Sequence, residues 1–145
     1  MTGRSEDNAP NTLDGCPDGN GGTYTSDESI DVITIQSVGG GSLKAGDSAR
    51  ITAEVYVYND KDTAEFWTKT ALDNPWQIVG RVPAAAGSKQ QTLTSPQFQL
   101  SSSLVQAVRV QLAYNLPEDN TNPCLGLAGD GQWADRDDLV FSVAA

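Results

Sequence analysis

Alternation of apolar and polar residues along two stretches constrains the fold of this chain most strongly. Residues 51–58 read ITAEVYVY, and residues 104–114 read LVQAVRVQLAY. Successive side chains of a β-strand point to opposite faces, so a period of two predicts strands with one buried face. The valines of the first stretch are therefore expected to face the core, and its two tyrosines to face solvent.

Further apolar or β-branched runs are separated by turns rich in Gly, Pro, Asn and Asp. Pro96 predicts a break or a sheet edge, because proline cannot donate a ladder hydrogen bond. No helical period extends beyond about two turns. The pattern predicts an antiparallel β-sandwich, jelly-roll or Ig-like, of about seven or eight strands. The further runs span residues 30–38, 63–71, 76–82, 91–100 and 139–143.

Residues 1–15 are polar and aperiodic, and we expect a tail or linker there, with one sandwich domain over residues 16–145. A long loop without any pattern is expected over residues 115–136. The first residues lack the apolar stretch of a signal peptide. No apolar run approaches the roughly 18 residues of a membrane span, so we expect no span.

The chain is strongly acidic, with 19 Asp and Glu against 9 Lys and Arg and a formal net charge of −10. This balance disfavours nucleic acid and anionic membrane surfaces as partners, because both require clustered basic residues. Most of the acids lie in two segments, residues 1–31 and 118–138. A local excess of charge of this kind needs a reason.

The only two cysteines, Cys16 and Cys124, lie in these acidic segments. A disulfide between them would join the two segments, and this is the pairing we expect; two free buried thiols are the alternative. The many glycines, the few lysines and the acidic loops fit an exported protein better than a cytosolic one. We therefore expect a secreted or extracellular location.

Carboxylates directly before two of the expected strands suggest a calcium site. Calcium takes six to eight oxygen ligands in relaxed geometry, and a bound ion would relieve the repulsion between the two acidic segments. Solvated acids that only keep the domain soluble are the alternative. The expected ligands are Asp27, Glu28, Asp31, Asp135, Asp137 and Asp138, with Asp18, Asn20 and Asp130 as second choices.

Several aromatic residues are candidates for a binding surface. Tyr56 and Tyr58 are expected to point outward and, with Trp67 or Trp76, they would form a platform for sugar rings or for a protein partner. Cross-strand aromatic pairs that only stabilise the sheet are the alternative.

The residues offer little for catalysis. The chain has no histidine, which removes the Ser-His-Asp and Cys-His arrangements and the commonest general base. A carboxylate pair could serve a glycosidase, but no separate cleft is indicated. We therefore expect a protein that is not an enzyme.

Several motifs resemble an accessory domain on the C-terminal side of secreted bacterial hydrolases and peptidases, fungalysin-like metallopeptidases among them. The resemblance implies an exported, non-catalytic β-sandwich. It departs at residues 133–136, which read WADR, where the family run is denser in acids and contains histidine. The motifs are Asp14-Gly-Cys16, Gly22-Thr-Tyr24, Ser26-Asp-Glu-Ser29 with Asp31, Leu104 to Val110, and Asp137 to Phe141.

Taken together, the sequence indicates a secreted, calcium-binding module for adhesion to, or targeting of, carbohydrate or protein surfaces. A structural, self-assembling domain of an extracellular surface or appendage protein is the main alternative. A carboxylate-dependent glycosidase is a weaker one. The sequence does not define the oligomeric state.

Overall fold

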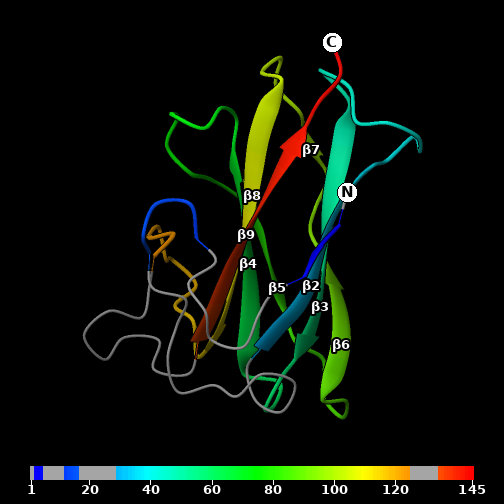
Figure 1. The fold of residues 1–145 in the computed structure, drawn as a ribbon. Helices are drawn as coiled ribbons and strands as arrows, with labels where there is room; N and C mark the ends of the chain where they lie inside the picture. Colours follow the sequence, from blue (N-terminus) through cyan, green and yellow to red (C-terminus); the bar gives the residue numbers. More distant parts are fainter. Residues whose placement is uncertain (1, 5–11, 17–28, 125–133) are drawn as a thin grey trace.

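The computed structural model describes residues 2–4, 12–16, 29–124 and 134–145. Two antiparallel sheets face each other as a β-sandwich, which confirms the predicted fold class (Figure 1). Among the described residues there is no helix, and hence none that could cross a membrane. The strands are β1 (Thr2–Arg4), β2 (Ser29–Ser37), β3 (Ser48–Tyr56), β4 (Asp62–Lys69), β5 (Gln77–Pro83), β6 (Gln90–Thr94), β7 (Phe98–Gln99), β8 (Val105–Tyr114) and β9 (Ala134–Ser142).

The strand order shows which of the two predicted topologies, jelly-roll or Ig-like, the sandwich has. The first sheet has the order β1-β2-β3-β6, with β7 also paired to β3, and the second has the order β5-β4-β8-β9. Apart from the short β1 and β7, this is the arrangement of an Ig-like sandwich, in which the third and fourth strands join the last two in one sheet. The expected break at Pro96 is confirmed, because that residue lies between β6 and β7.

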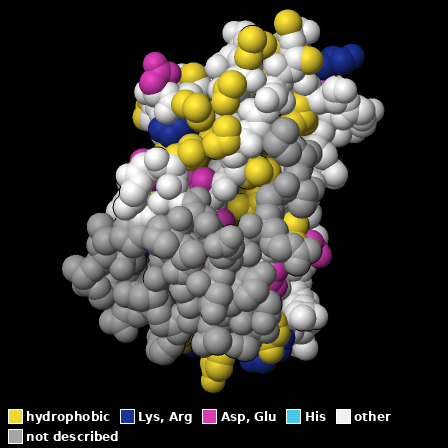
Figure 2. All heavy atoms as spheres, in the orientation of Figure 1, with side chains coloured by type: hydrophobic (Ala, Val, Ile, Leu, Met, Phe, Trp, Pro, Cys, Tyr) yellow, Lys and Arg dark blue, Asp and Glu magenta, His cyan; other side chains and the backbone are white. Residues whose placement is uncertain are grey.

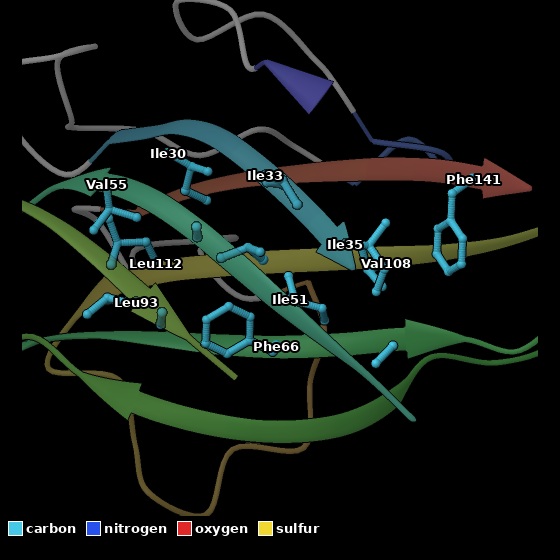
Figure 3. Packing of buried hydrophobic residues seen from close by; sticks show 14 of the residues in the cluster. Ile30, Ile33, Ile35, Ile51, Val55, Phe66, Leu93, Val108, Leu112 and Phe141 are labelled. Atoms are coloured by element: carbon cyan, nitrogen blue, oxygen red, sulfur yellow. The ribbon is translucent and has the colours of Figure 1, made fainter. Parts of the chain in front are cut away.

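One hydrophobic cluster fills the space between the sheets. Figure 3 shows Phe66 and Leu112 of the second sheet pointing towards Ile51 and Leu93 of the first. The first three of these side chains are fully buried. Complete burial of a side chain of this size contributes about 1.5–3 kcal/mol, so this cluster is the main source of stability.

The predicted alternation holds for β3 and fails for β5. Val55 and Val57 face the core, whereas Tyr58 beyond the end of β3 is 57% exposed. In β5 the alternation of Trp76, Ile78, Gly80 and Val82 predicts one shared core face, but Ile78 is exposed while Val79 packs against the core. The reason is a β-bulge at this point of the β4–β5 pair, which reverses the faces of the residues that follow.

The last strand begins earlier than predicted. Residues 115–136 were expected to form a loop, but β9 begins at Ala134 and pairs with β8 as far as Ser142. The acids that precede Leu139 are therefore strand residues. They are accommodated because Asp138 lies opposite Arg109 and Asp135 accepts a hydrogen bond from the Ile30 backbone, so that β9 gains partners for its charges.

Both faces of β8 are buried from Gln106 to Ala113, although its pattern predicted one solvent face. Arg109 and Gln111, on the outer face, have no exposed surface. The outer face of the second sheet is covered by residues 12–16 and 115–124, which lie on the same side of it in Figure 1. The described parts of the expected tail are thus attached to the sandwich, since β1 also pairs with β2.

Candidate functional site

The outer face of the second sheet combines three residues that the sequence analysis had singled out, Trp67, Trp76 and Asp138, with others to which it gave no role. The strand register arranges them in rows that run across β5, β4, β8 and β9. The first row is charged and buried, the second combines an ion pair with aromatic and aliphatic groups, and the third is largely apolar. In strand order the rows are Arg81, Glu65, Gln111 and Arg136; then Ile78, Trp67, Arg109 and Asp138; then Lys69, Ala107 and Val140, with Trp76 beside Lys69 just before β5.

The first row is a network of hydrogen bonds around Glu65, which has no exposed surface. Its carboxylate pairs with Arg81 at 2.9 Å and accepts bonds from Gln111 at 3.0 Å and from Asn120 at 2.7 Å. Gln111 accepts in turn from Arg136. Burial raises the pKa of Glu65, although the bonds from Asn120 and Gln111 favour its ionised form. The same three donors also bond to backbone carbonyls, Arg81 to that of Leu116, and Gln111 and Asn120 to that of Asn122.

The second row is centred on Arg109, whose guanidinium is fully buried. Nε donates to Asp138 at 2.7 Å, and Nη2 donates to Asp138 at 2.9 Å and to Asp14 at 2.7 Å. Nη1 donates to the Pro123 carbonyl at 3.0 Å. The Trp76 ring lies against the guanidinium, 4.4 Å from Cζ to the ring centroid, which is close enough for a cation–π interaction.

The two carboxylates keep Arg109 charged despite its burial. Burial lowers the pKa of Arg109, but the hydrogen bonds and charges of Asp138 and Asp14 raise it further, and the net direction is upward. Burial also raises the pKa of Asp14, but hydrogen bonds from Arg109 and from the Trp76 indole, together with the charge of Arg109, bring it down to about 2. Asp14 is thus a carboxylate over the usual pH range.

The predicted disulfide is confirmed and holds both covering segments on this face. Cys16 and Cys124 are bonded, with 5.8 Å between their Cα atoms. Asp14 precedes Cys16 by two residues, and Pro123 directly precedes Cys124. The bridge therefore fixes the two segments that supply Arg109 with its third and fourth bonds.

The structure places the described calcium candidates in different layers. Asp135 and Asp137 lie opposite the core residues Leu112 and Val110, and so face the interior of the sandwich, whereas Asp138 faces outward towards Arg109. Asp31 lies in the first sheet. Among the described residues, no three acidic or cysteine side chains are grouped as a metal site would require.

The remaining calcium candidates lie outside the described residues: Asp27, Glu28, Asp18, Asn20 and Asp130.

Asp31, the calcium candidate in the first sheet, accepts a bond from the Ser29 hydroxyl at 2.9 Å. Burial raises the pKa of Asp31, the bond from Ser29 lowers it and the nearby charge of Glu54 raises it again. Calcium binding stays a prediction.

The four aromatic candidates do not share one surface. Tyr56 and Tyr58 belong to the outer side of the first sheet, and Tyr58 is covered by the Lys89 ammonium at 4.4 Å. Trp67 lies on the outer side of the second sheet and is only 3% exposed. Trp76 is half-buried, with Lys69 over its ring as well as Arg109. Their rings are thus occupied or divided between opposite faces of the sandwich.

An aliphatic surface borders the network at its third row. Val140 pairs with Ala107, and Val105 is the next outward residue of β8, so these valines are neighbours on one face. The Leu13 backbone lies beside the same strand, because its N–H donates to Asp138, two residues before Val140, at 2.8 Å. We call this surface the outer-face patch; it comprises Leu13, Leu72, Leu104, Val105 and Val140, between 39% and 59% exposed.

Two connections bring the remaining members of the patch to the same end of the sheet. The Ser101 hydroxyl donates to the Thr70 carbonyl at 2.6 Å, which ties the turn holding Leu72 to the residues that lead into Leu104. Figure 2 shows hydrophobic side chains gathered on this upper part of the molecule, beside β8 and the β4–β5 connection. The patch is aliphatic rather than aromatic.

Sequence reasoning missed the polar face because its pattern is that of a solvent face. Arg109 and Gln111 alternate with apolar residues as exposed side chains would. The positions of the two cysteines were the one available signal. A bridge between loops that are far apart in the sequence requires these loops to meet, and so to lie over some part of the molecule. No property of single residues showed that these loops would lie over β8.

Comparison with known proteins adds no relative: no family model, no curated protein and no solved structure matches the chain. The fold and the site therefore define the class by themselves. It is an Ig-like β-sandwich in which a disulfide closes a polar network on one sheet and an aliphatic patch lies beside it.

Proposed function

We propose that this chain is a non-catalytic module of an exported protein that docks onto a protein surface through the outer-face patch. The observation that carries the proposal is the patch itself. Exposed apolar residues grouped on a sheet face mark interaction sites in soluble proteins. Here Val105 and Val140 lie at one end of the second sheet, and Leu13, Leu72 and Leu104 belong to segments bonded beside it.

The chemistry of the patch favours a protein over a carbohydrate. Sugar rings bind on exposed aromatic faces, but Trp67 is buried and Trp76 is half-buried and flanked by Arg109 and Lys69. Leu and Val side chains instead match the apolar centre of a protein interface. Carbohydrate targeting through Tyr58 is the second candidate, because Tyr58 is the most exposed aromatic side chain among the described residues.

Charge complementarity describes the partner more closely. The chain carries a net charge of −10, and the Asp14 side chain beside the patch is 43% exposed. A complementary surface has an apolar centre and a basic rim, which would speed association and make it sensitive to salt. A second copy of this chain is a poor partner, since two acidic surfaces repel each other.

The groups with perturbed pKa values support a non-catalytic role. Glu65, Asp14 and Arg109 each bond to other protein groups, and together they hold the covering segments in place. Perturbed pKa values also arise in structural ion-pair networks. We assign these residues to the closure of the fold.

Calcium binding remains part of the proposal. The Ile30 N–H donates to Asp135 at 2.7 Å, so the starts of β2 and β9 adjoin each other. Both strands follow acidic segments of the sequence. An ion held there would stabilise the joint start of the two strands.

The test of docking compares matched variants. A Val105→Ser/Val140→Ser variant and a Tyr58→Ser control are immobilised, and proteins captured from the extracellular fraction are then purified and titrated against each variant. We expect a partner that loses at least about tenfold in affinity for the double variant, keeps its affinity for the control and binds more weakly in high salt. Equal binding to all variants, or glycan binding lost in the Tyr58 variant, would contradict protein docking through the patch.

A further inference from the structure

The second sheet ends at β9, and every second residue of β9 directs its backbone groups away from β8. The Val143 N–H donates to the Leu104 carbonyl at 2.9 Å, so this pair and each alternate pair of the β8–β9 register exchange hydrogen bonds. The residues between these positions face the other way. The backbone N–H and C=O groups of Asp138, Val140 and Ser142 therefore point to the free side of β9.

This free side is closed at its two ends and open between them. At the end of the strand, the Ala144 N–H donates to the Leu43 carbonyl at 2.9 Å, and the Ala45 N–H donates to the Ala144 carbonyl at 2.8 Å. At the start, the Asp135 carboxylate accepts from the Ile30 N–H. Among the residues that the structure describes, no backbone group pairs with the free side over residues 138–142.

The open stretch of β9 lacks the features that keep strand edges from pairing with other chains. Among the described strands, β1 and β6 are short, with three and five residues, and β5 packs against Pro96 at Gly80. By contrast, Asp138–Ser142 contains no proline, lysine or bulge. A regular edge of this kind is a template for a further strand.

A groove of about 590 Å³ adjoins the open edge on the inner side of β9. Its apolar lining includes Ile35 of β2, Leu43 and Val143, and its polar lining includes Gln36 and Ser142. The volume lies within the roughly 300–1,000 Å³ that is usual for ligand sites. Because Ser142 belongs both to the groove and to the open edge, a chain that pairs with β9 can place side chains in the groove.

We infer that the free edge of β9 and this groove form a binding site for an extended polypeptide segment, which adds to the second sheet as a further strand. Backbone hydrogen bonds hold the segment, and its alternate side chains give specificity. The side chains that enter the groove are apolar, to match Ile35, Leu43 and Val143. Those between them lie on the outer face.

The charge of the chain selects the outward side chains of the segment. Asp14 lies on the same outer face, bonded to Arg109, and its side chain is 43% exposed. The whole chain has a net charge of −10. Lysine or arginine side chains therefore complement this face, whereas acidic ones are repelled. The occupant is a segment that alternates apolar and basic residues.

The site stands apart from docking through the outer-face patch, because it depends on backbone groups and on the inner side of β9. Val140 belongs to both, since its side chain is in the patch and its backbone faces the open edge. Val105 of β8 belongs to the patch alone. Variants at these two positions distinguish the failure of one proposal from the failure of the other.

Amide hydrogen exchange, resolved by NMR, tests the edge on the wild-type chain. In the free chain we expect fast exchange at Val140 and Ser142 and slow exchange at Leu139 and Phe141. The probe is the synthetic peptide Lys-Val-Lys-Val-Lys-Val-Lys, and at saturation it should slow exchange at Val140 and Ser142 at least about tenfold. Slow exchange at these two amides without peptide, or no change at about 1 mM peptide, would overturn the site.

Matched variants and a control peptide test how the probe binds. Val140→Pro removes an N–H on the free side without removing a bond to β8, and Val140→Thr keeps that N–H. We expect the peptide to lose at least about tenfold in affinity for Val140→Pro, and to keep its affinity for Val140→Thr and Val105→Ser. Unchanged affinity for Val140→Pro would overturn strand addition, and weaker binding to Val105→Ser alone would place the peptide on the patch instead.

An isomer of the peptide with its lysines and valines in separate blocks is the control for charge. It should bind the wild-type chain at least about tenfold more weakly, because its apolar side chains no longer share one face of a strand. Equal affinity of the two peptides would show attraction between opposite charges only, and would overturn the site.

Discussion

Arg109 is the residue on which the covered face depends, since its guanidinium joins a strand and two covering segments. Replacing it by Met leaves Asp138 buried without its cation. We expect Arg109→Met to lower the free energy of unfolding by about 3–5 kcal/mol, the cost of leaving one partner of a buried ion pair alone. Arg50→Met, on an exposed position of β3, should change it by less than about 0.5 kcal/mol. Urea denaturation of both variants checks this, and equal effects would show that the Arg109 network adds nothing.

Asp14 gives the network a pH dependence with a defined sign. Its pKa in the folded protein is lowered to about 2 from an ordinary value of 3.8. A lowered pKa stabilises the folded state above the unfolded pKa, and this stabilisation is lost as pH falls through the folded value. The stability difference between wild type and Asp14→Asn should therefore be constant above about pH 5 and shrink between pH 4 and pH 2. Urea denaturation across this range measures it, and a difference that grows on acidification would contradict the ion pair.

At the scale of the strand, Gly80 of β5 packs closely against Pro96, which lies between β6 and β7. A methyl group on Gly80 would lie 2.6 Å from Cγ and 2.7 Å from Cδ of Pro96. We expect Gly80→Ala to destabilise the fold by about 1–3 kcal/mol, because such a contact forces β5 and the segment at Pro96 apart. Gly39→Ala is the matched control, since its nearest atom is 3.9 Å away. Thermal denaturation of the two variants tests this. Similar melting temperatures would show that Pro96 moves aside at little cost in free energy.

The strands themselves were largely predictable because their signal is local. The period of two in β3 and the proline between β6 and β7 reflect side-chain direction and backbone donors, which neighbouring residues determine. The bulge in β5 was not predictable, because it depends on how β4 lies against it. The early start of β9 was missed for a similar reason: Asp138 is stable in a strand only because Arg109 of β8 lies opposite. Pairing across the sheet decided both cases.

For the candidate site, the sequence indicated which residues carry chemistry but not how they combine. The cysteine pairing followed from there being only two. The grouping of Tyr56 with Trp67 failed, because whether two strands share a sheet is a property of topology. The role of Glu65 was missed for the same reason, since its partners Arg81, Gln111 and Asn120 come from three other parts of the chain.

At the scale of the whole molecule, the disulfide restricts the unfolded chain most. It links residues 108 positions apart. In the chain-entropy model such a loop contributes roughly 4 kcal/mol. The Cys16→Ser/Cys124→Ser variant should therefore be less stable by up to about this amount while still unfolding cooperatively. Equilibrium denaturation against the oxidised chain tests the size of the effect, and an unchanged midpoint would contradict it.

Calcium would act on the molecule as a whole through the joint start of β2 and β9. If only the folded state binds, calcium at 100 times the dissociation constant adds about 2.7 kcal/mol. A thermal melt in EDTA and then in excess calcium should show a rise of several degrees that is absent in Asp135→Ala. An unchanged melt would mean that these acids serve only to pair with the backbone and to keep the protein soluble.

Site-specific photo-crosslinking shows whether this sandwich docks onto a protein through the outer-face patch. A photoreactive phenylalanine analogue replaces Val105 in one sample and Tyr58, on the other sheet's side, in a second. We expect a protein crosslink from position 105 that competes with unlabelled chain and is lost in high salt, and none from position 58. Crosslinking from position 58 alone would rule out docking through the patch and place the binding surface on the first sheet.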